Sequence, residues 1–150
     1  GRATYKDRGM ELYNLKEGAI ADLTEAEPRR DGQWEADVFT SPVPLRTKTG
    51  VCFPPVALIA ETGSGFILCA DVLTQGASEV QILGDALIEA MKRHQQIPIA
   101  VAVRPGFDES LTPLSALLAL RIEVRNNMGT LAAVWQSLLA KMKKDLPGGS

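Results

Sequence analysis

The stretch IPIAVAV at residues 97–103 gives the main indication of the fold class of this chain. It is almost wholly apolar and places a β-branched residue at every second position. A strand of this kind is covered on both faces, which is typical of a central strand in a parallel sheet. Pro105 and Gly106 follow it and end the strand. We therefore expect a parallel strand at the centre of a sheet.

Three more strands are predicted before this one. Residues 34–40 alternate between apolar and polar side chains, as a half-buried strand requires. The core face would hold Trp34, Ala36, Val38 and Thr40, and the outer face Glu35, Asp37 and Phe39. After a polar turn at residues 46–50, the apolar runs 56–61 and 66–73 are joined by a Thr-Gly-Ser-Gly hairpin turn. We expect an antiparallel triplet whose first strand also pairs with residues 97–103.

Three helices and one further strand complete the predicted order. Ser78, followed by Gln81, forms a capping box for a helix that runs to about Gln95. Thr112 is expected to cap a short helix that has proline at its first position. The alternation at residues 121–125 predicts an outer strand.

The last helix carries the clearest pattern. After a Thr130 cap, apolar residues recur at the spacing of one helix face. This stripe consists of Leu131, Val134, Trp135, Leu138, Leu139 and Met142. We expect a single core that buries together Leu83, Leu87, Ile99, Val101, Leu117, Trp135 and Leu138.

The length and the charge balance limit the classes of protein. The 150 residues suit a single hydrophobic core. The 16 Lys and Arg residues against 18 Asp and Glu residues give a net charge of −2, so no long-range field attracts nucleic acid or an anionic membrane. Contact with nucleic acid would need a local patch of basic residues. Lys141, Lys143 and Lys144 gather at the end of the last helix, where they complement the helix dipole or form a phosphate-binding patch.

The cysteines and the apolar runs indicate an intracellular domain. Cys52 and Cys69 are expected to be buried free thiols, with a disulfide between them as the alternative. The longest apolar run, residues 51–60, contains two prolines and is shorter than the ~20 residues of a membrane span. The chain begins without methionine, so we expect a segment of a longer protein from which any targeting segment has been removed. The expected location is the cytoplasm. Residues 1–33 are expected to form an extension or linker, and residues 34–150 the domain itself.

The order of the predicted elements resembles the ribonuclease H-like superfamily. That α/β fold has a β-β-β-α-β-α-β-α order and a mixed five-stranded sheet with helices on both faces. The Trp-Glu-Ala-Asp strand at residues 34–37 and the runs at 56–63 and 65–68 resemble the opening of integrase and transposase cores. They are still more similar to an uncharacterised bacterial family, a domain of unknown function that shares the W-x-x-D strand and the T-G hairpin. The resemblance covers roughly residues 33–143.

This resemblance implies a degenerate active site. Nucleases of the superfamily hold two metal ions with carboxylates from the first strand, the end of the fourth strand and a helix. Only Asp37 matches this pattern, because Arg104 stands at the end of the fourth strand and the last helix contains no acidic residue. Asp37 could instead pair with Arg104. Asp108 and Glu109 could supply replacement carboxylates, or could favour the N-terminus of the helix that follows.

A ligand pocket is expected where the parallel strands end. The candidate ligand-binding residues are Asp37, Arg104, Phe107, Asp108, Asn126 and Asn127. Arg104 could bind a carboxylate or a phosphate in a bidentate fork, whereas the asparagines could be ordinary turn residues. His94 is the single histidine and is expected at a helix C-terminus, so a Ser-His-Asp triad is not expected.

The leading hypothesis is therefore a noncatalytic α/β module, a binding or interaction domain of a larger bacterial protein. Its partner would be another protein or an adjacent domain, and a small molecule at Arg104 is a further hypothesis. We expect no catalytic residue, metal or cofactor, and neither nucleic acid nor a membrane as partner. The alternative hypothesis is a metal-dependent nuclease or phosphodiesterase that uses Asp37 with Asp108 or Glu109.

Overall fold

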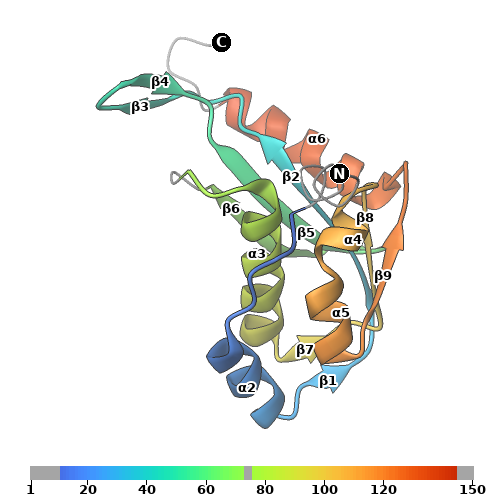
Figure 1. The fold of residues 1–150 in the computed structure, drawn as a ribbon. Helices are drawn as coiled ribbons and strands as arrows, with labels where there is room; N and C mark the ends of the chain where they lie inside the picture. The colour runs from blue at the N-terminus through green and yellow to red at the C-terminus, as the bar shows by residue number, and fades with distance from the viewer. Residues whose placement is uncertain (1–10, 73–75, 145–150) are drawn as a thin grey trace, which may run out of the picture.

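The computed structural model describes residues 11–72 and 76–144 and contains a mixed five-stranded sheet (Figure 1). In the order β6-β5-β2-β8-β9, the strands are β6 (Ile67–Val72), β5 (Pro55–Glu61), β2 (Gln33–Thr40), β8 (Ala100–Val103) and β9 (Arg121–Val124). Strand β2 pairs antiparallel with β5 and parallel with β8. Strand β5 pairs antiparallel with β6, and β8 parallel with β9. The predicted triplet and its parallel neighbour are confirmed, although Leu73 lies outside the described residues.

Helices cover both faces of this sheet. They are α2 (Glu17–Glu25), α3 (Glu79–His94), α4 (Phe107–Ser110), α5 (Thr112–Leu118) and α6 (Gly129–Lys144). On one face α3 packs on β5, β2 and β6, with α2 against it, while α6 packs on β5 and β2 on the other face (Figure 1). His94 lies in the last turn of α3, as expected. None of the described helices is long and apolar enough to cross a bilayer.

Each face of the sheet has its own apolar cluster. The cluster on the α3 face contains Leu83, Leu87 and Val101. The cluster on the α6 face contains Trp135, and Leu138 packs against it while half-buried. The prediction of one shared core is therefore wrong, because the sheet separates the two clusters.

Two residues predicted in the core are exposed instead. Ile99 is 51 % exposed and Leu117 is 54 % exposed. Pro98 has no amide hydrogen and interrupts the predicted strand, so Ile99 precedes β8 and falls outside its alternation. Leu111, Leu114 and Leu118 are fully buried and define the inner face of α5, and Leu117 lies about a quarter turn around the helix from that face.

Two short strand pairs lie outside the main sheet. They are formed by β1 (Arg29–Arg30) with β7 (Gln96–Ile97), and by β3 (Leu45–Thr47) with β4 (Gly50–Cys52). The second pair is a hairpin where the sequence predicted only a polar turn, because three-residue strands are too short to show an alternation. It lies within residues 41–54, which join β2 to β5 and which we name the arm. The arm projects from the body of the domain (Figure 1).

Strand β2 is covered on both faces, so the prediction of a half-buried strand is wrong. Glu35 is only 2 % exposed, and Phe39 stacks on Trp135 of α6. Helix α6 therefore covers the face that the alternation assigned to solvent. The opposite face is buried as predicted, except for Thr40 at the end of the strand.

The predicted helix caps are right in one case of three. Ser78 Oγ accepts a hydrogen bond from the Gln81 amide at 3.2 Å and is the N-cap of α3. Thr112 lies inside α5 and donates to the Glu109 carbonyl at 2.8 Å, because α4 runs almost directly into α5. Thr130 lies inside α6, where its hydroxyl accepts from the backbone of the β5–β6 turn.

The described residues ahead of Trp34 pack against α3. Tyr13, Ile20 and Leu23 are buried in the cluster on the α3 face. Gly84 lets the Tyr13 ring approach α3 closely, since a Cβ at this position would lie 2.3 Å from the ring. This segment therefore contributes to the core, and the domain boundary at residue 33 stays a prediction.

The two cysteines are free thiols. Cys69 is buried, whereas Cys52 on the arm is only half-buried. Burial raises the pKa of the Cys69 thiol to about 12, so this thiol is protonated and unreactive at neutral pH.

Candidate functional site

The carboxyl ends of the parallel strands β2, β8 and β9 meet at one edge of the sheet, beside a cavity of about 370 Å³. Its polar lining consists of Asp37, Arg104, Arg125, Asn126, Asn127 and Gln136. Its apolar lining consists of Phe39, Met128, Leu131, Ala132 and Trp135. Parallel strands end at the same edge, so residues that are distant in the sequence face one space.

Arg104 is held in place by three neighbours. Its Nε donates to Asp37 Oδ1 and its Nη2 donates to Glu79 Oε1, both at 2.9 Å. Its guanidinium carbon lies 4.7 Å from the centroid of the Phe107 ring, which is a cation–π distance. These contacts fix the guanidinium plane. Its Nη1 makes no hydrogen bond to any residue that the structure describes.

Asp37 is the acid that matches the nuclease pattern, and it is engaged by Arg104. Its side chain is 14 % exposed, and Oδ1 also accepts from the Val38 amide at 2.8 Å. Burial raises the pKa of the Asp37 carboxyl, although the Val38 hydrogen bond and the Arg104 charge act in the opposite direction. The ion pair is one of the two roles that the sequence left open for Asp37.

A second arginine at the cavity was missed from the sequence. Arg125 Nη2 donates to Glu123 Oε1 at 3.2 Å, and Arg121 Nε donates to Glu123 Oε2 at 2.8 Å. The hydrogen bond from Arg121 is the main cause that lowers the pKa of Glu123. Of these two arginines, only Arg125 lines the cavity. Its position directly before the two predicted asparagines could have identified it.

The remaining predicted residues divide into two groups. Asn126 and Asn127 line the cavity, and Phe107 lies buried beneath Arg104. Asp108 and Glu109 are not part of the cavity wall, and Asp108 Oδ1 accepts from the backbone amide of the turn before α4 at 3.1 Å. In the described part of the chain, no three His, Cys, Asp or Glu side chains converge so that they could hold a metal ion.

Two further features of the site also escaped the sequence. Glu35 Oε1 accepts from the Leu131 amide in the first turn of α6 at 2.9 Å, so the sheet itself caps this helix. The Phe39 and Trp135 rings stack with centroids 4.5 Å apart and form part of the cavity wall. The spacing of Glu35, Asp37 and Phe39 places all three on one face of β2. The alternation along β2 is visible in the sequence, but it predicts that this face of the strand is exposed to solvent.

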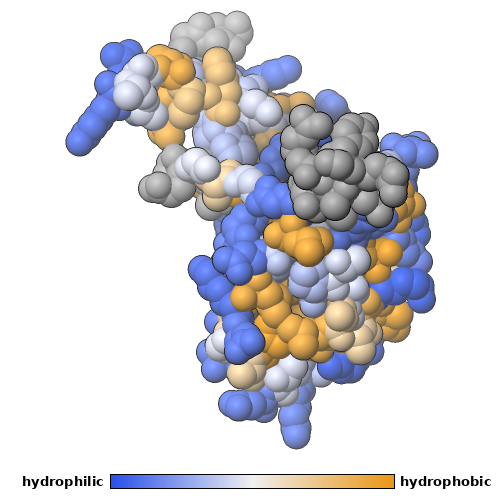
Figure 2. Space-filling view, in the orientation of Figure 1, coloured by the Kyte–Doolittle hydropathy of each residue, from blue (hydrophilic) through white to orange (hydrophobic). Residues whose placement is uncertain are grey.

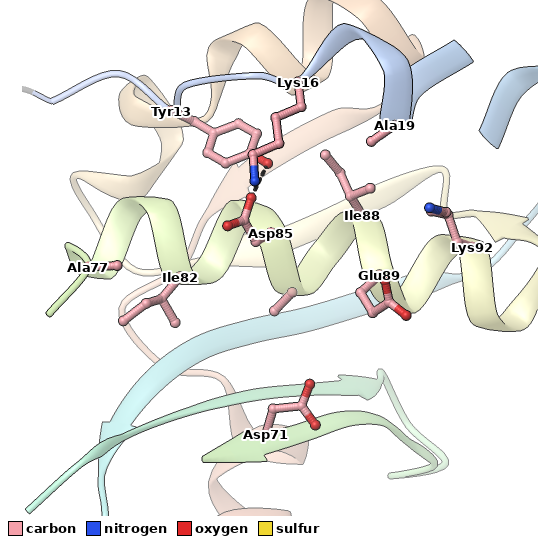
Figure 3. Close-up of a pocket in the computed structure, with 11 residues that line it drawn as sticks. Tyr13, Lys16, Ala19, Asp71, Ala77, Ile82, Asp85, Ile88, Glu89 and Lys92 are labelled. Carbon is pink, nitrogen blue, oxygen red and sulfur yellow. Dashed lines mark hydrogen bonds between the residues drawn. The ribbon is translucent and has the colours of Figure 1, made fainter. Parts of the chain in front are cut away.

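A second cavity of about 480 Å³ lies along α3 beside the N-terminal segment (Figure 3). The Tyr13 hydroxyl donates to Asp85 Oδ1 at 2.6 Å. Burial, followed by the neighbouring Asp85, raises the pKa of Tyr13. The charged groups around this cavity are Lys16, Asp71, Asp85, Glu89 and Lys92. Their mixed signs favour no single class of ligand.

The fold and the site define an α/β domain with a mixed five-stranded sheet and a cavity, lined by polar and apolar side chains, where its parallel strands end. The chain belongs to the family DUF6930, a domain of unknown function, whose profile matches residues 19–139. The match begins within α2 and ends within α6. The expected membership in an uncharacterised domain family is therefore confirmed. No curated protein matches the chain.

Proposed function

We propose that this chain is a noncatalytic ribonuclease H-like module that binds a small anionic ligand, as one domain of a longer protein. The strand order β6-β5-β2-β8-β9, with α3 and α6 on opposite faces, supports the ribonuclease H-like assignment because it matches the layout expected for that superfamily. The binding role rests on one observation. Arg104 is fixed beside a cavity at the position where the nucleases carry a carboxylate.

The charges around Asp37 favour a noncatalytic role over the nuclease alternative. Asp37 is paired with Arg104, whose positive charge would repel a metal ion. Asp108 and Glu109 are not beside Asp37 in the cavity wall, and α6 contains no acidic residue. Two-metal catalysis needs several anionic ligands around the ions. In this proposal Asp37 orients Arg104.

The cavity wall suits a small carboxylate with an apolar body. Arg104, Arg125, Asn126 and Asn127 bring hydrogen-bond donors to it. A guanidinium group can bind a carboxylate through two parallel hydrogen bonds. The stacked aromatic pair offers the ligand an apolar surface. The volume of about 370 Å³ falls within the range of small-molecule sites, roughly 300 to 1,000 Å³.

Benzoate is a suitable probe, because benzamide has the same ring without the charge. In an NMR titration, we expect benzoate to bind at least about tenfold more tightly than benzamide. Arg125→Gln should weaken benzoate binding about tenfold, since a hydrogen bond to a charged group is lost. Arg121→Gln is the matched control, because Arg121 binds the same Glu123 without lining the cavity. No benzoate binding, equal affinity for benzamide, or equal loss in both variants would contradict the proposal.

The noncatalytic part of the proposal has its own test. The purified chain is expected to show no cleavage of DNA or RNA that depends on Mg²⁺ or Mn²⁺. Cleavage that persists through further purification and disappears in Asp37→Asn would contradict the proposal and favour the nuclease alternative.

A further inference from the structure

The small net charge of the chain conceals an uneven distribution of charge. Residues 41–54 and 129–144 contain five of the 16 Lys and Arg residues and none of the 18 Asp and Glu residues. The rest of the chain therefore holds 11 basic and 18 acidic residues. The five cations are Arg46 and Lys48 on the arm and Lys141, Lys143 and Lys144 at the end of α6. All five are exposed, and no described carboxylate forms an ion pair with them.

The arm carries apolar surface as well as charge. Arg46 on β3 lies opposite Val51 on β4, so the two side chains share one face of the hairpin. Val51 is 60 % exposed and Phe53 is 55 % exposed. Figure 2 shows apolar surface on the arm beside its hydrophilic tip. An isolated two-stranded hairpin is only marginally stable in water, so we expect a partner to cover this face.

The direction of α6 brings its lysines to the end of the sheet where the arm starts. The Leu131 amide binds Glu35 near the start of β2, and Trp135 stacks on Phe39 near the end of β2. Helix α6 therefore runs along β2 toward the arm. Lys141 lies six residues beyond Trp135, about 9 Å farther along the helix. The base of the arm and the last turn of α6 accordingly lie at the same end of the domain (Figure 1).

We propose that the arm and the last turn of α6 form a docking surface for the anionic face of a lipid bilayer. The cations are attracted by anionic headgroups, and this attraction acts within a Debye length, so the net charge of the whole chain does not prevent it. Val51 and Phe53 would leave water at the boundary between headgroups and acyl chains. An aliphatic side chain such as Val51 finds no apolar contact along a phosphate backbone, which favours a bilayer over nucleic acid. The inference is independent of the ligand proposed for the cavity.

Co-sedimentation of the full chain with vesicles tests the charged half of this surface. We expect binding to phosphatidylcholine vesicles that contain about one third phosphatidylglycerol, and at least about tenfold weaker binding to pure phosphatidylcholine vesicles. Replacing Lys141, Lys143 and Lys144 together with Gln should lower the partition coefficient about 100-fold, because each lysine contributes a factor of about five. The matched control replaces Lys16, Lys92 and Arg93 with Gln. It removes the same charge from the α3 side and should change binding less than about twofold.

A second pair of variants tests the apolar half. Val51→Ser combined with Phe53→Ser should weaken binding to the anionic vesicles at least about tenfold, because two apolar side chains no longer leave water. Ile99→Ser combined with Leu117→Ser is the control, since these side chains are 51 % and 54 % exposed on other parts of the surface. Circular dichroism and thermal unfolding of each variant separate a lost docking surface from a lost fold.

Several outcomes would overturn the proposal. One is equal binding to neutral and anionic vesicles, and another is a control variant that weakens binding as much as its test variant. Failure to bind the anionic vesicles would also overturn it. If the chain instead binds a DNA duplex and the triple lysine variant does not, the surface serves nucleic acid and the bilayer is the wrong partner.

Discussion

The two faces of the sheet are covered to different depths. On the α3 face, several helices and the N-terminal segment seal one continuous apolar cluster. On the α6 face, Leu131 and Trp135 are the buried residues of α6, and the rest of its apolar stripe is half-buried. Helix α6 packs on β5 and β2, and the cavity lies beside it where β2, β8 and β9 end. The comparison shows that the main core and the candidate binding site lie on opposite sides of one sheet.

Leu83→Ala should cause the largest loss of stability. Leu83 is fully buried on the α3 face, so the free energy of unfolding should fall by about 2 to 5 kcal/mol. Urea denaturation measures this change. Leu117→Ala is the control, because Leu117 is 54 % exposed and its loss should cost less than about 0.5 kcal/mol. Equal effects of the two variants would mean that the α3 face is not the main core.

Glu35→Ala should have the next largest effect, on the α6 face. The Leu131 amide would lose its acceptor at a buried position, which should lower the free energy of unfolding by about 1 to 3 kcal/mol. Glu35→Gln retains a side-chain oxygen as acceptor and should keep most of the stability. If both variants lose the same amount in urea denaturation, the hydrogen bond is not the cause.

Leu138→Ala measures the packing of α6 directly. Leu138 is half-buried, so we expect a loss of roughly 1 to 2 kcal/mol, about half the cost for a fully buried leucine. Urea denaturation, as for Leu83→Ala, measures this loss of stability. A loss as large as that of Leu83→Ala would show that both faces are packed to the same depth, and the comparison would fail.

The smallest expected effect is a pH dependence at the end of β2. Burial raises the pKa of Asp37 above its ordinary 3.8, so the folded chain binds this proton more tightly than the unfolded chain. The stabilising contribution of Asp37 is therefore full below pH 3.8 and is lost as the pH rises through the window between 3.8 and the raised pKa. Relative to Asp37→Asn, the free energy of unfolding of the wild type should fall as the pH rises above 3.8. A rise would mean that the Arg104 charge outweighs burial.

Much of the fold could be predicted because the main elements carry local patterns. The apolar run at residues 97–103 and the stripe along α6 identify a strand and a helix without knowledge of their neighbours. What covers an element depends on distant residues. Glu35 was predicted to face solvent because its partner Leu131 lies 96 residues away. The arm was missed for a different reason, since its strands have only three residues each.

The candidate site was partly predictable for a physical reason. Arg104, Asn126 and Asn127 follow two parallel strands, and parallel strands end at the same edge of a sheet. The aromatic wall could not be predicted in the same way, because Phe39 and Trp135 meet only through the path of α6 across β2. Asp108 was predicted at the site because it follows the same strand, but its carboxylate turns back to the backbone.

The ion pairs of Glu123 at β9 affect whether a strand from a second molecule can pair with this edge of the sheet. Strand β9 is an outer strand, and Glu123 pairs with Arg121 on the strand and with Arg125 directly after it. A strand from a second molecule that paired here would take this row of charges partly out of water, at a cost that the new backbone hydrogen bonds would have to exceed. Edge-to-edge growth into fibrils is therefore disfavoured at β9, although an open strand edge is the usual starting point for such aggregation.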